Sequence, residues 1–162
     1  MISLLKSSRQ KKLLEQLIEQ FGCDRISFIK FFSDFVFVEI SDKICLCRSE
    51  TVKKIASSTK PNFVGLYFCK IEQGGIRLSL DGAWLVKPFA KKNLLELDSE
   101  MVEDWMKGND IRGNFLNLGN YVILCYNSLV LGCGKVTKSK TVIKNFVPKE
   151  RRVYSDLPIP SS

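Results

Sequence analysis

The chain has 162 residues, of which 45% are hydrophobic and 26% charged, a composition typical of a globular protein with one ordinary domain or two small ones. No apolar run approaches the ~20 residues that a membrane-spanning helix needs, and residues 1–12 lack the ordered regions of a secretion signal. The sequence has no histidine, which excludes imidazole acid–base catalysis, Ser–His and Cys–His nucleophile pairs, and metal sites with a histidine ligand. The net charge of +8 favours a polyanionic partner.

The first part of the chain is predicted to be a small α+β unit. Apolar residues recur at helical spacing over residues 7–21, and Gly22 is a plausible stop for that helix. Residues 35–40 and 44–48 predict two strands joined by a turn. Eight of the eleven phenylalanines fall between residues 21 and 68, which predicts a separate N-terminal core.

The next elements are a short helix over residues 50–56 and a polar loop over 57–62. Residues 63–71 predict a strand. The glycines of residues 73–75 predict a tight hairpin turn into a second strand over 76–80, because glycine adopts the positive φ that such turns require.

Residues 80–89 are ambiguous between helix and strand, and Asp81 is a candidate cap for a short helix. A further helix is predicted to begin after Asp98 or Ser99 and to run through residue 107, with Gly108 at its C-terminal end. Its first turn is acidic, as the helix dipole favours.

The last third is predicted to be β-rich. After a short strand over residues 94–97, longer strands are expected over 121–126, 129–136 and 141–147. We therefore predict an α+β fold in three parts: an N-terminal α+β domain (1–90), a β-rich domain (91–155) and a flexible tail (156–162).

The six cysteines are predicted to be reduced and buried. Most sit among apolar strand residues, where a free thiol behaves as a small hydrophobe. Cys45 and Cys47 lack the spacing of a zinc knuckle, and the sequence has no second pair. We expect no metal, no cofactor, no catalytic residue and a cytoplasmic location.

Almost all the excess charge lies in residues 112–152, which hold eight basic residues and one acid. Lysine and arginine neutralise phosphates, and an asparagine can hydrogen-bond a base or sugar edge. The alternative to a polyanion-binding segment is a solvated charged face that only keeps the protein in solution. The candidate RNA-binding residues are Arg112, Lys135, Lys138, Lys140, Lys144, Asn145, Lys149, Arg151 and Arg152.

The segment Gly132-Cys-Gly-Lys135 is not a P-loop, because the G-x4-G-K-[ST] spacing is absent and no helix is predicted after it. Together with Trp105-Met-Lys-Gly108, Gly119-Asn-Tyr121, and Ile143-Lys-Asn145-x-x-Pro-Lys149-x-x-Arg152, it resembles a PUA domain. The resemblance covers roughly residues 94–153. It is closest to the C-terminal PUA-like module of RsmF-type and Nol/Nop/Sun-type rRNA cytosine methyltransferases.

The layout of a small α+β domain followed by a PUA domain is also similar to stand-alone pre-PUA plus PUA proteins of ribosome biogenesis in archaea and eukaryotes. The segment from Gly65 to Arg77-Leu-Ser-Leu80 lies where that group has a similar one. These resemblances imply a compact β pseudobarrel that binds structured RNA and has no catalytic centre. The expected RNA is rRNA, and tRNA is the alternative. The chain departs from the methyltransferases because it has no room for a methyl-donor fold and no Pro-Cys motif.

Four functional hypotheses follow. The first is a monomeric, non-enzymatic RNA-binding protein of ribosome biogenesis or RNA modification. The second is an adaptor whose phenylalanine-rich N-terminal domain docks onto an RNA methyltransferase or a ribosome-assembly protein. The third is an enzyme that acts on RNA, and the fourth a membrane-surface binder. The fourth fits poorly because the basic segment predicts strands rather than an amphipathic helix.

Overall fold

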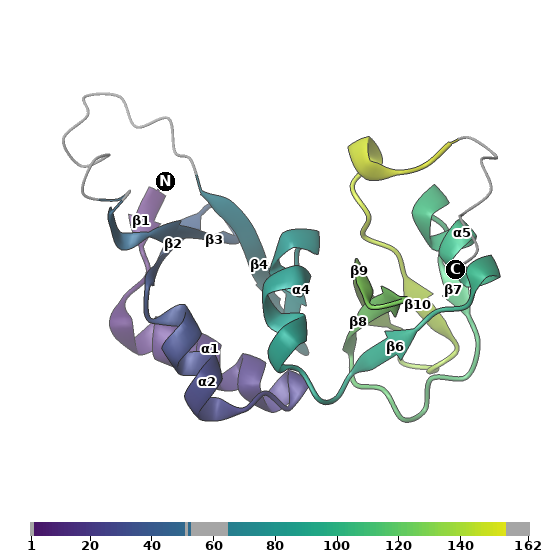
Figure 1. Ribbon diagram of the computed structural model, residues 1–162, viewed down its shortest axis with the longest axis horizontal. Helices are drawn as coiled ribbons and strands as arrows, with labels where there is room; N and C mark the ends of the chain where they lie inside the picture. Colours follow the sequence, from purple (N-terminus) through teal and green to yellow (C-terminus); the bar gives the residue numbers. More distant parts are fainter. Residues whose placement is uncertain (1, 51, 53–64, 155–162) are drawn as a thin grey trace.

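The computed structural model describes residues 2–50, 52 and 65–154, and within them the chain forms two five-stranded sheets with helices packed against them (Figure 1). The first sheet is an antiparallel meander with the strands in chain order. Its strands are β1 (Ile2–Leu4), β2 (Phe35–Ile40), β3 (Lys43–Arg48), β4 (Leu66–Glu72) and β5 (Gly75–Leu78). The tight turn between β4 and β5 places Gly74 and Gly75 at positive φ, as a short hairpin requires.

Two helices cover the first sheet (Figure 1). Helix α1 (Ser7–Phe21) ends at Gly22, whose left-handed φ of 62° closes the last turn. Helix α2 (Arg25–Phe32) begins at Asp24, whose carboxylate accepts a hydrogen bond from the backbone N–H of Ser27. The sequence analysis did not predict α2, because helical and strand periods overlap in this phenylalanine-rich segment.

The second sheet has the strand order β6-β8-β9-β10-β7, with β6 parallel to β8 and the other pairs antiparallel. Helix α5 (Ser99–Lys107) packs beside it, capped by Asp98 and ended by Gly108. The strands are β6 (Leu94–Glu96), β7 (Ile111–Arg112), β8 (Tyr121–Tyr126), β9 (Leu129–Val136) and β10 (Val142–Lys144).

Helix α4 (Leu80–Val86), continued by a 3-10 turn η1 (Lys87–Phe89), lies between the two sheets (Figure 1). It contacts both β4 and β9. Its cap is Ser79, whose Oγ accepts the backbone N–H of Gly82, so the expectation of a cap at Asp81 was wrong. Gly82 is required here, since a Cβ would lie 2.1 Å from the carbonyl oxygen of Phe68.

The buried hydrophobic side chains of the described residues form two cores, and the first joins both sheets. Phenylalanines of α1, α2, β2 and β4 form its centre, but Tyr121, Ile123 and Cys133 from the second sheet belong to the same cluster. The prediction of a separate N-terminal core was therefore wrong. The second core surrounds Trp105, which is fully buried between α5 and the other face of the second sheet.

Most predicted elements are confirmed, including the first helix and the strand pairs 35–40/44–48 and 121–126/129–136. The strand predicted over residues 141–147 was too long, because β10 ends at Lys144 and a 3-10 turn η2 (Lys149–Arg151) follows. The predicted loop at 57–62 and tail at 156–162 lie outside the described residues, as does most of the predicted helix at 50–56. The α+β class is confirmed. Among the described residues, no helix has the length and apolarity to cross a membrane.

Candidate nucleic-acid interface

Three of the predicted basic residues lie on one face of the second sheet, on three adjacent strands. Lys135 of β9 stands directly opposite Lys144 of β10, so both side chains project from the same face. Arg112 of β7 stands opposite Val142, two residues before Lys144 and hence also on this face. We call Arg112, Lys144 and Lys135 the basic row.

Tyr121 of β8 continues the row, because it pairs with Lys135. The Lys135 ammonium lies 5.6 Å from the centroid of the Tyr121 ring. The opposite face of the same strands carries Val136 and Ile143, which are buried in the second core. Gly134 lets these strands approach, since a Cβ there would lie 2.3 Å from Cγ2 of Ile143.

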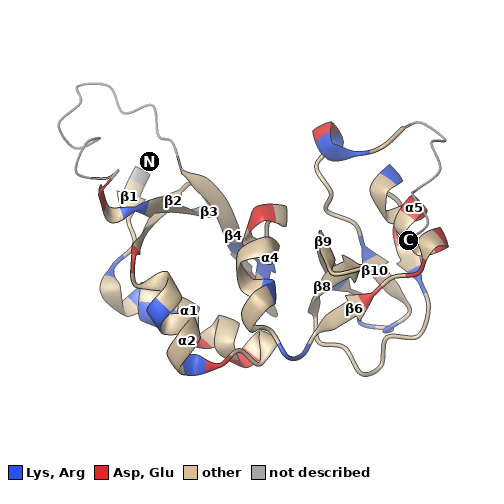
Figure 2. Ribbon diagram, viewed as in Figure 1, with Lys and Arg blue, Asp and Glu red and all other residues tan. Residues whose placement is uncertain are grey.

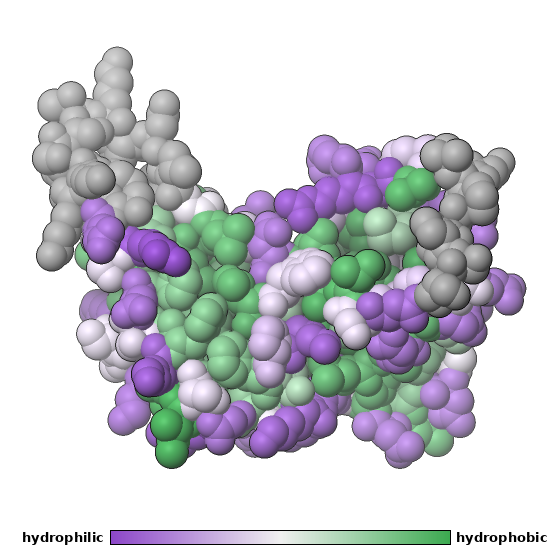
Figure 3. Space-filling view, viewed as in Figure 1, coloured by the Kyte–Doolittle hydropathy of each residue, from purple (hydrophilic) through white to green (hydrophobic). Residues whose placement is uncertain are grey.

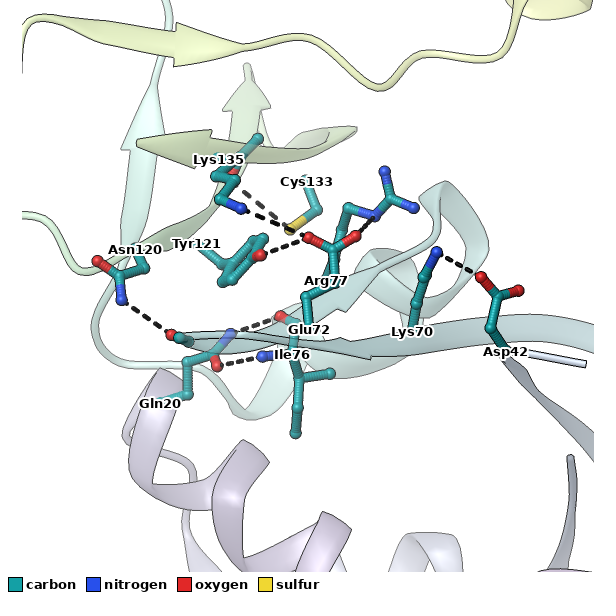
Figure 4. A network of polar contacts seen from close by, with 12 residues as sticks. Gln20, Asp42, Lys70, Glu72, Ile76, Arg77, Asn120, Tyr121, Cys133 and Lys135 are labelled. Atoms are coloured by element: carbon teal, nitrogen blue, oxygen red, sulfur yellow. Dashed lines mark hydrogen bonds and ion pairs between the residues drawn. The ribbon is translucent and has the colours of Figure 1, made fainter. Parts of the chain in front are cut away.

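A single carboxylate, Glu72 at the end of β4, ties the row to the first sheet (Figure 4). The Tyr121 hydroxyl donates to Oε2 of Glu72 at 2.6 Å. Arg77 Nε lies 3.1 Å from Oε1 and Lys135 Nζ 3.6 Å from Oε2. Lys135 is thus partly neutralised inside the protein, while its side chain stays 42% exposed.

Lys144 is also paired. Its ammonium donates to Oδ2 of Asp110 at 2.8 Å, and the other carboxylate oxygen accepts the backbone N–H of Asn145 at 2.9 Å. These contacts fix the position where the chain leaves β10. The Lys144 side chain remains 54% exposed, so one side of its ammonium faces solvent.

Both carboxylates titrate below their ordinary range. Burial by itself would raise the pKa of Glu72, but the Tyr121 hydrogen bond and the charges of Arg77 and Lys135 outweigh it and lower the pKa. The same balance applies to Asp110: burial raises its pKa, and the bonds from Lys144 and Asn145 more than reverse that effect. Both groups are therefore anionic at neutral pH.

The segment after β10 brings Phe146 and Arg151 to the junction of the two sheets, where they meet residues of the N-terminal half. The guanidinium carbon of Arg77 lies 4.3 Å from the centroid of the Phe146 ring, an arrangement typical of cation–π stacking. Arg151 of η2 reaches Asp81 at the start of α4, with both N–O distances at 3.4 Å. In Figure 2 the η2 turn, which carries both blue and red residues, lies above the acidic start of α4.

The nine predicted residues do not form one patch. Lys138 and Lys140 lie in the turn after β9, beyond Val136, whereas Phe146 and Arg151 run beside the earlier part of that strand. Lys140 is held in this turn with a φ of 58°, and its ammonium donates to the carbonyl of Leu118 at 2.8 Å.

Two predicted residues have structural roles. The Asn145 amide nitrogen donates to the carbonyls of Trp105 at 2.8 Å and Asn109 at 2.9 Å. Its Oδ1 accepts the backbone N–H of Val147, so every polar group of this side chain has a partner. Arg152 Nε donates to the Val147 carbonyl at 3.1 Å.

Arg152 also covers Gly108 at the C-terminal end of α5, where a Cβ would lie 2.5 Å from its Nε. A cation at this position complements the helix dipole.

Three predicted residues are exposed, and their side chains form no hydrogen bond or ion pair with another described residue: Arg112, Lys138 and Lys149. Their charges are available to phosphates without breaking an internal pair. Arg77 is the residue that the prediction missed. It lies in the Arg77-Leu-Ser-Leu80 segment, which was part of the similarity to stand-alone pre-PUA plus PUA proteins. Its contact with Phe146 could not be predicted, because the two residues are far apart in the chain.

All six cysteines are free and buried, and burial raises the pKa of the Cys23 thiol to about 11 and that of Cys69 further. Such thiols are poor nucleophiles at neutral pH. Within residues 2–50, 52 and 65–154, no group of three or more cysteine, aspartate or glutamate side chains is placed to hold a metal ion.

Comparison with known proteins gives one match, over the part of the chain that builds the second sheet. Residues 92–153 match the family model described as the methyltransferase RsmF PUA domain. No curated protein matches the chain. The match includes α5, the basic row and η2, but no methyltransferase catalytic domain. The C-terminal part of this chain is therefore a PUA-like module that resembles the one in RsmF-type methyltransferases.

Proposed function

We propose that this chain is a non-enzymatic RNA-binding protein that holds structured RNA, ribosomal RNA in particular, along the basic row and η2. The observation that carries the proposal is the alignment of Arg112, Lys144 and Lys135 on one face of a module that resembles the PUA domain of an RNA methyltransferase. Shape and phosphate contacts would select a folded RNA. A role in ribosome biogenesis or RNA modification fits this chemistry.

Substituting the exposed cations that have no internal ion pair among the described residues gives the most direct test of this proposal. The variant Arg112→Gln/Lys138→Gln/Lys149→Gln removes three exposed charges whose side chains form no hydrogen bond or ion pair with a described residue. The matched control, Lys11→Gln/Lys12→Gln/Lys30→Gln, removes three exposed charges from α1 and α2. Both proteins and the wild type are titrated with a fluorescent rRNA stem-loop at 50 and 200 mM salt.

Each phosphate contact contributes about −0.7 to −0.9 to the slope of log affinity against log salt. We expect the interface variant to lose about two units of slope and the control to keep the wild-type slope. Equal losses in both variants would mean that total charge, and not the exposed cations of the PUA-like module, drives binding. No binding at 50 mM salt would overturn the proposal.

A protein–protein adaptor is the second candidate, favoured by apolar residues that α2 leaves exposed. Ile26 is 80% exposed, and Ile29 and Phe31 are more than one-third exposed. The variant Ile26→Ser/Ile29→Ser would abolish co-purification of an RNA methyltransferase or ribosome-assembly protein without changing RNA affinity. Unchanged co-purification would count against α2 as the docking face.

A further inference from the structure

A cavity of about 330 Å³ lies where the two sheets meet, between α4, β9 and the segment that leads to η2. Both halves of the chain build it. Tyr67, Ser79 and Asp81 come from the N-terminal half, and Gly132, Phe146 and Arg151 from the PUA-like module. In Figure 3 the surface between α4 and η2 shows hydrophobic residues beneath a hydrophilic rim.

The floor and the rim of this cavity differ in chemistry. Leu78, Leu131 and Val147 supply apolar surface, and Gly132 adds space because it has no side chain. The flat guanidinium of Arg77 is already stacked on the Phe146 ring at 4.3 Å. A wall of this kind is suited to a planar ring, since bases stack on aromatic rings and on arginine planes alike.

The rim offers charges of both signs. Arg151 and Asp81 pair loosely across the mouth at 3.4 Å, and both side chains are more than one-third exposed. A bare phosphate would be repelled by the Asp81 carboxylate, and so would an acidic peptide. The edge of a nucleobase carries donors and acceptors together and can satisfy both groups.

We propose that this cavity takes one unpaired base of the RNA that the basic row holds, an inference that rests on the proposed function. The ring enters beside Arg77 and Phe146, its polar edge meets Asp81 and Arg151, and its phosphate lies toward Lys149. Arg77 and Lys135 bind the same Glu72 carboxylate, so the cavity wall adjoins the basic row. One strand of RNA can therefore contact both.

The test uses the full chain and an rRNA stem-loop in which each loop position is made abasic in turn. Two tryptophan substitutions on β9 form a matched pair. Leu131→Trp fills the cavity, whereas Leu129→Trp places the same side chain at a position that is 54% exposed and outside it. A second variant, Phe146→Leu, keeps an apolar side chain but removes the flat ring. Affinity is measured by fluorescence anisotropy.

We expect one abasic position to weaken wild-type binding about tenfold or more, as loss of a stacked base does. Leu131→Trp and Phe146→Leu should weaken binding of the intact RNA by a similar factor and make it insensitive to that abasic position. Leu129→Trp should behave as wild type. In ¹H–¹⁵N spectra of the wild type, the amides of Leu131, Gly132 and Cys133 should shift with the intact RNA and not with the abasic one.

Three results would overturn the inference. RNA that binds equally well with every loop position abasic would leave the RNA-binding proposal standing and remove the base pocket. Shifts of the cavity amides with a free nucleoside monophosphate, but not with RNA, would make the cavity a mononucleotide site. Absence of RNA binding by the wild type at 50 mM salt would remove both proposals.

Discussion

Replacing Glu72 with glutamine tests how much one carboxylate adds to the contacts that join the two sheets. Glutamine keeps the size of the side chain and an acceptor for the Tyr121 hydroxyl, but it removes the charge that Arg77 and Lys135 share. The Glu72 side chain is only 20% exposed, so water does not easily replace these contacts.

The expected loss can be estimated contact by contact. A hydrogen bond to a charged acceptor contributes about 1.5–3 kcal/mol and one to a neutral acceptor about 1, so weakening the Tyr121 bond costs about 1 kcal/mol. The pairs with Arg77 and Lys135 add less than about 1 kcal/mol each, the Lys135 pair least because that lysine is 42% exposed. The total is about 2 kcal/mol, or about 4–8 °C in Tm for a chain of this size.

Thermal and urea unfolding of wild type, Glu72→Gln, Tyr121→Phe and the double variant form a cycle that isolates the pair. We expect a coupling of about 1 kcal/mol between the two substitutions. Glu72→Gln should also bind RNA more tightly and with a steeper salt dependence, because Lys135 is then free for a phosphate. A Tm change below 1 °C, or additive effects in the cycle, would refute the view that Glu72 stabilises the junction of the two sheets.

Three further predictions concern stability. Because the pKa of Glu72 is lowered from its ordinary value of 4.5, the ionised carboxylate stabilises the fold above that pH, and this contribution is lost as the pH falls below it. Urea unfolding from pH 7 to pH 3 should show this loss of stability. Glu72→Gln should make the free energy of unfolding depend less on pH in this range. Gly134→Ala places a methyl group 2.3 Å from Ile143 and should lower the free energy of unfolding by about 1–3 kcal/mol, and an unchanged urea midpoint would contradict the packing argument. Asn145→Ala should lower the free energy of unfolding by about 2 kcal/mol, because it leaves three backbone groups without their hydrogen-bond partner. Lys149→Ala should leave Tm unchanged and weaken RNA binding. Loss of stability in Lys149→Ala, or loss of RNA binding alone in Asn145→Ala, would show that the two roles are exchanged.

Local signals in the sequence predicted the elements that depend on neighbouring residues. Asp98 and Gly108 mark the two ends of α5, and Gly74 and Gly75 mark the turn of the first hairpin, because caps and turns are made by residues within a few positions of one another. The concentration of basic charge and the PUA-like pattern were equally visible without coordinates.

Predictions failed where distant contacts override local preference. A strand was predicted through residue 147, but the Asn145 side chain binds the carbonyls of Trp105 and Asn109 and turns the chain out of the sheet. The N-terminal core was predicted to be separate, yet Tyr121 and Cys133 complete it from the second sheet. Periodicity shows that a face is apolar, but it does not show which surface covers that face.

The sequence by itself determined the α+β class, the PUA-like module and the total charge of its basic segment. Only the tertiary structure decided what each cation does. It leaves the side chains of Lys138 and Lys149 without a bond to any other described residue, pairs Lys135 with Glu72, and uses Arg152 to cover a helix end. It also brings Arg77 against Phe146 to form the wall of the cavity. The physical reason is that charge is a property of one residue, whereas its neutralisation and its place in a site depend on partners that folding brings together from distant parts of the chain.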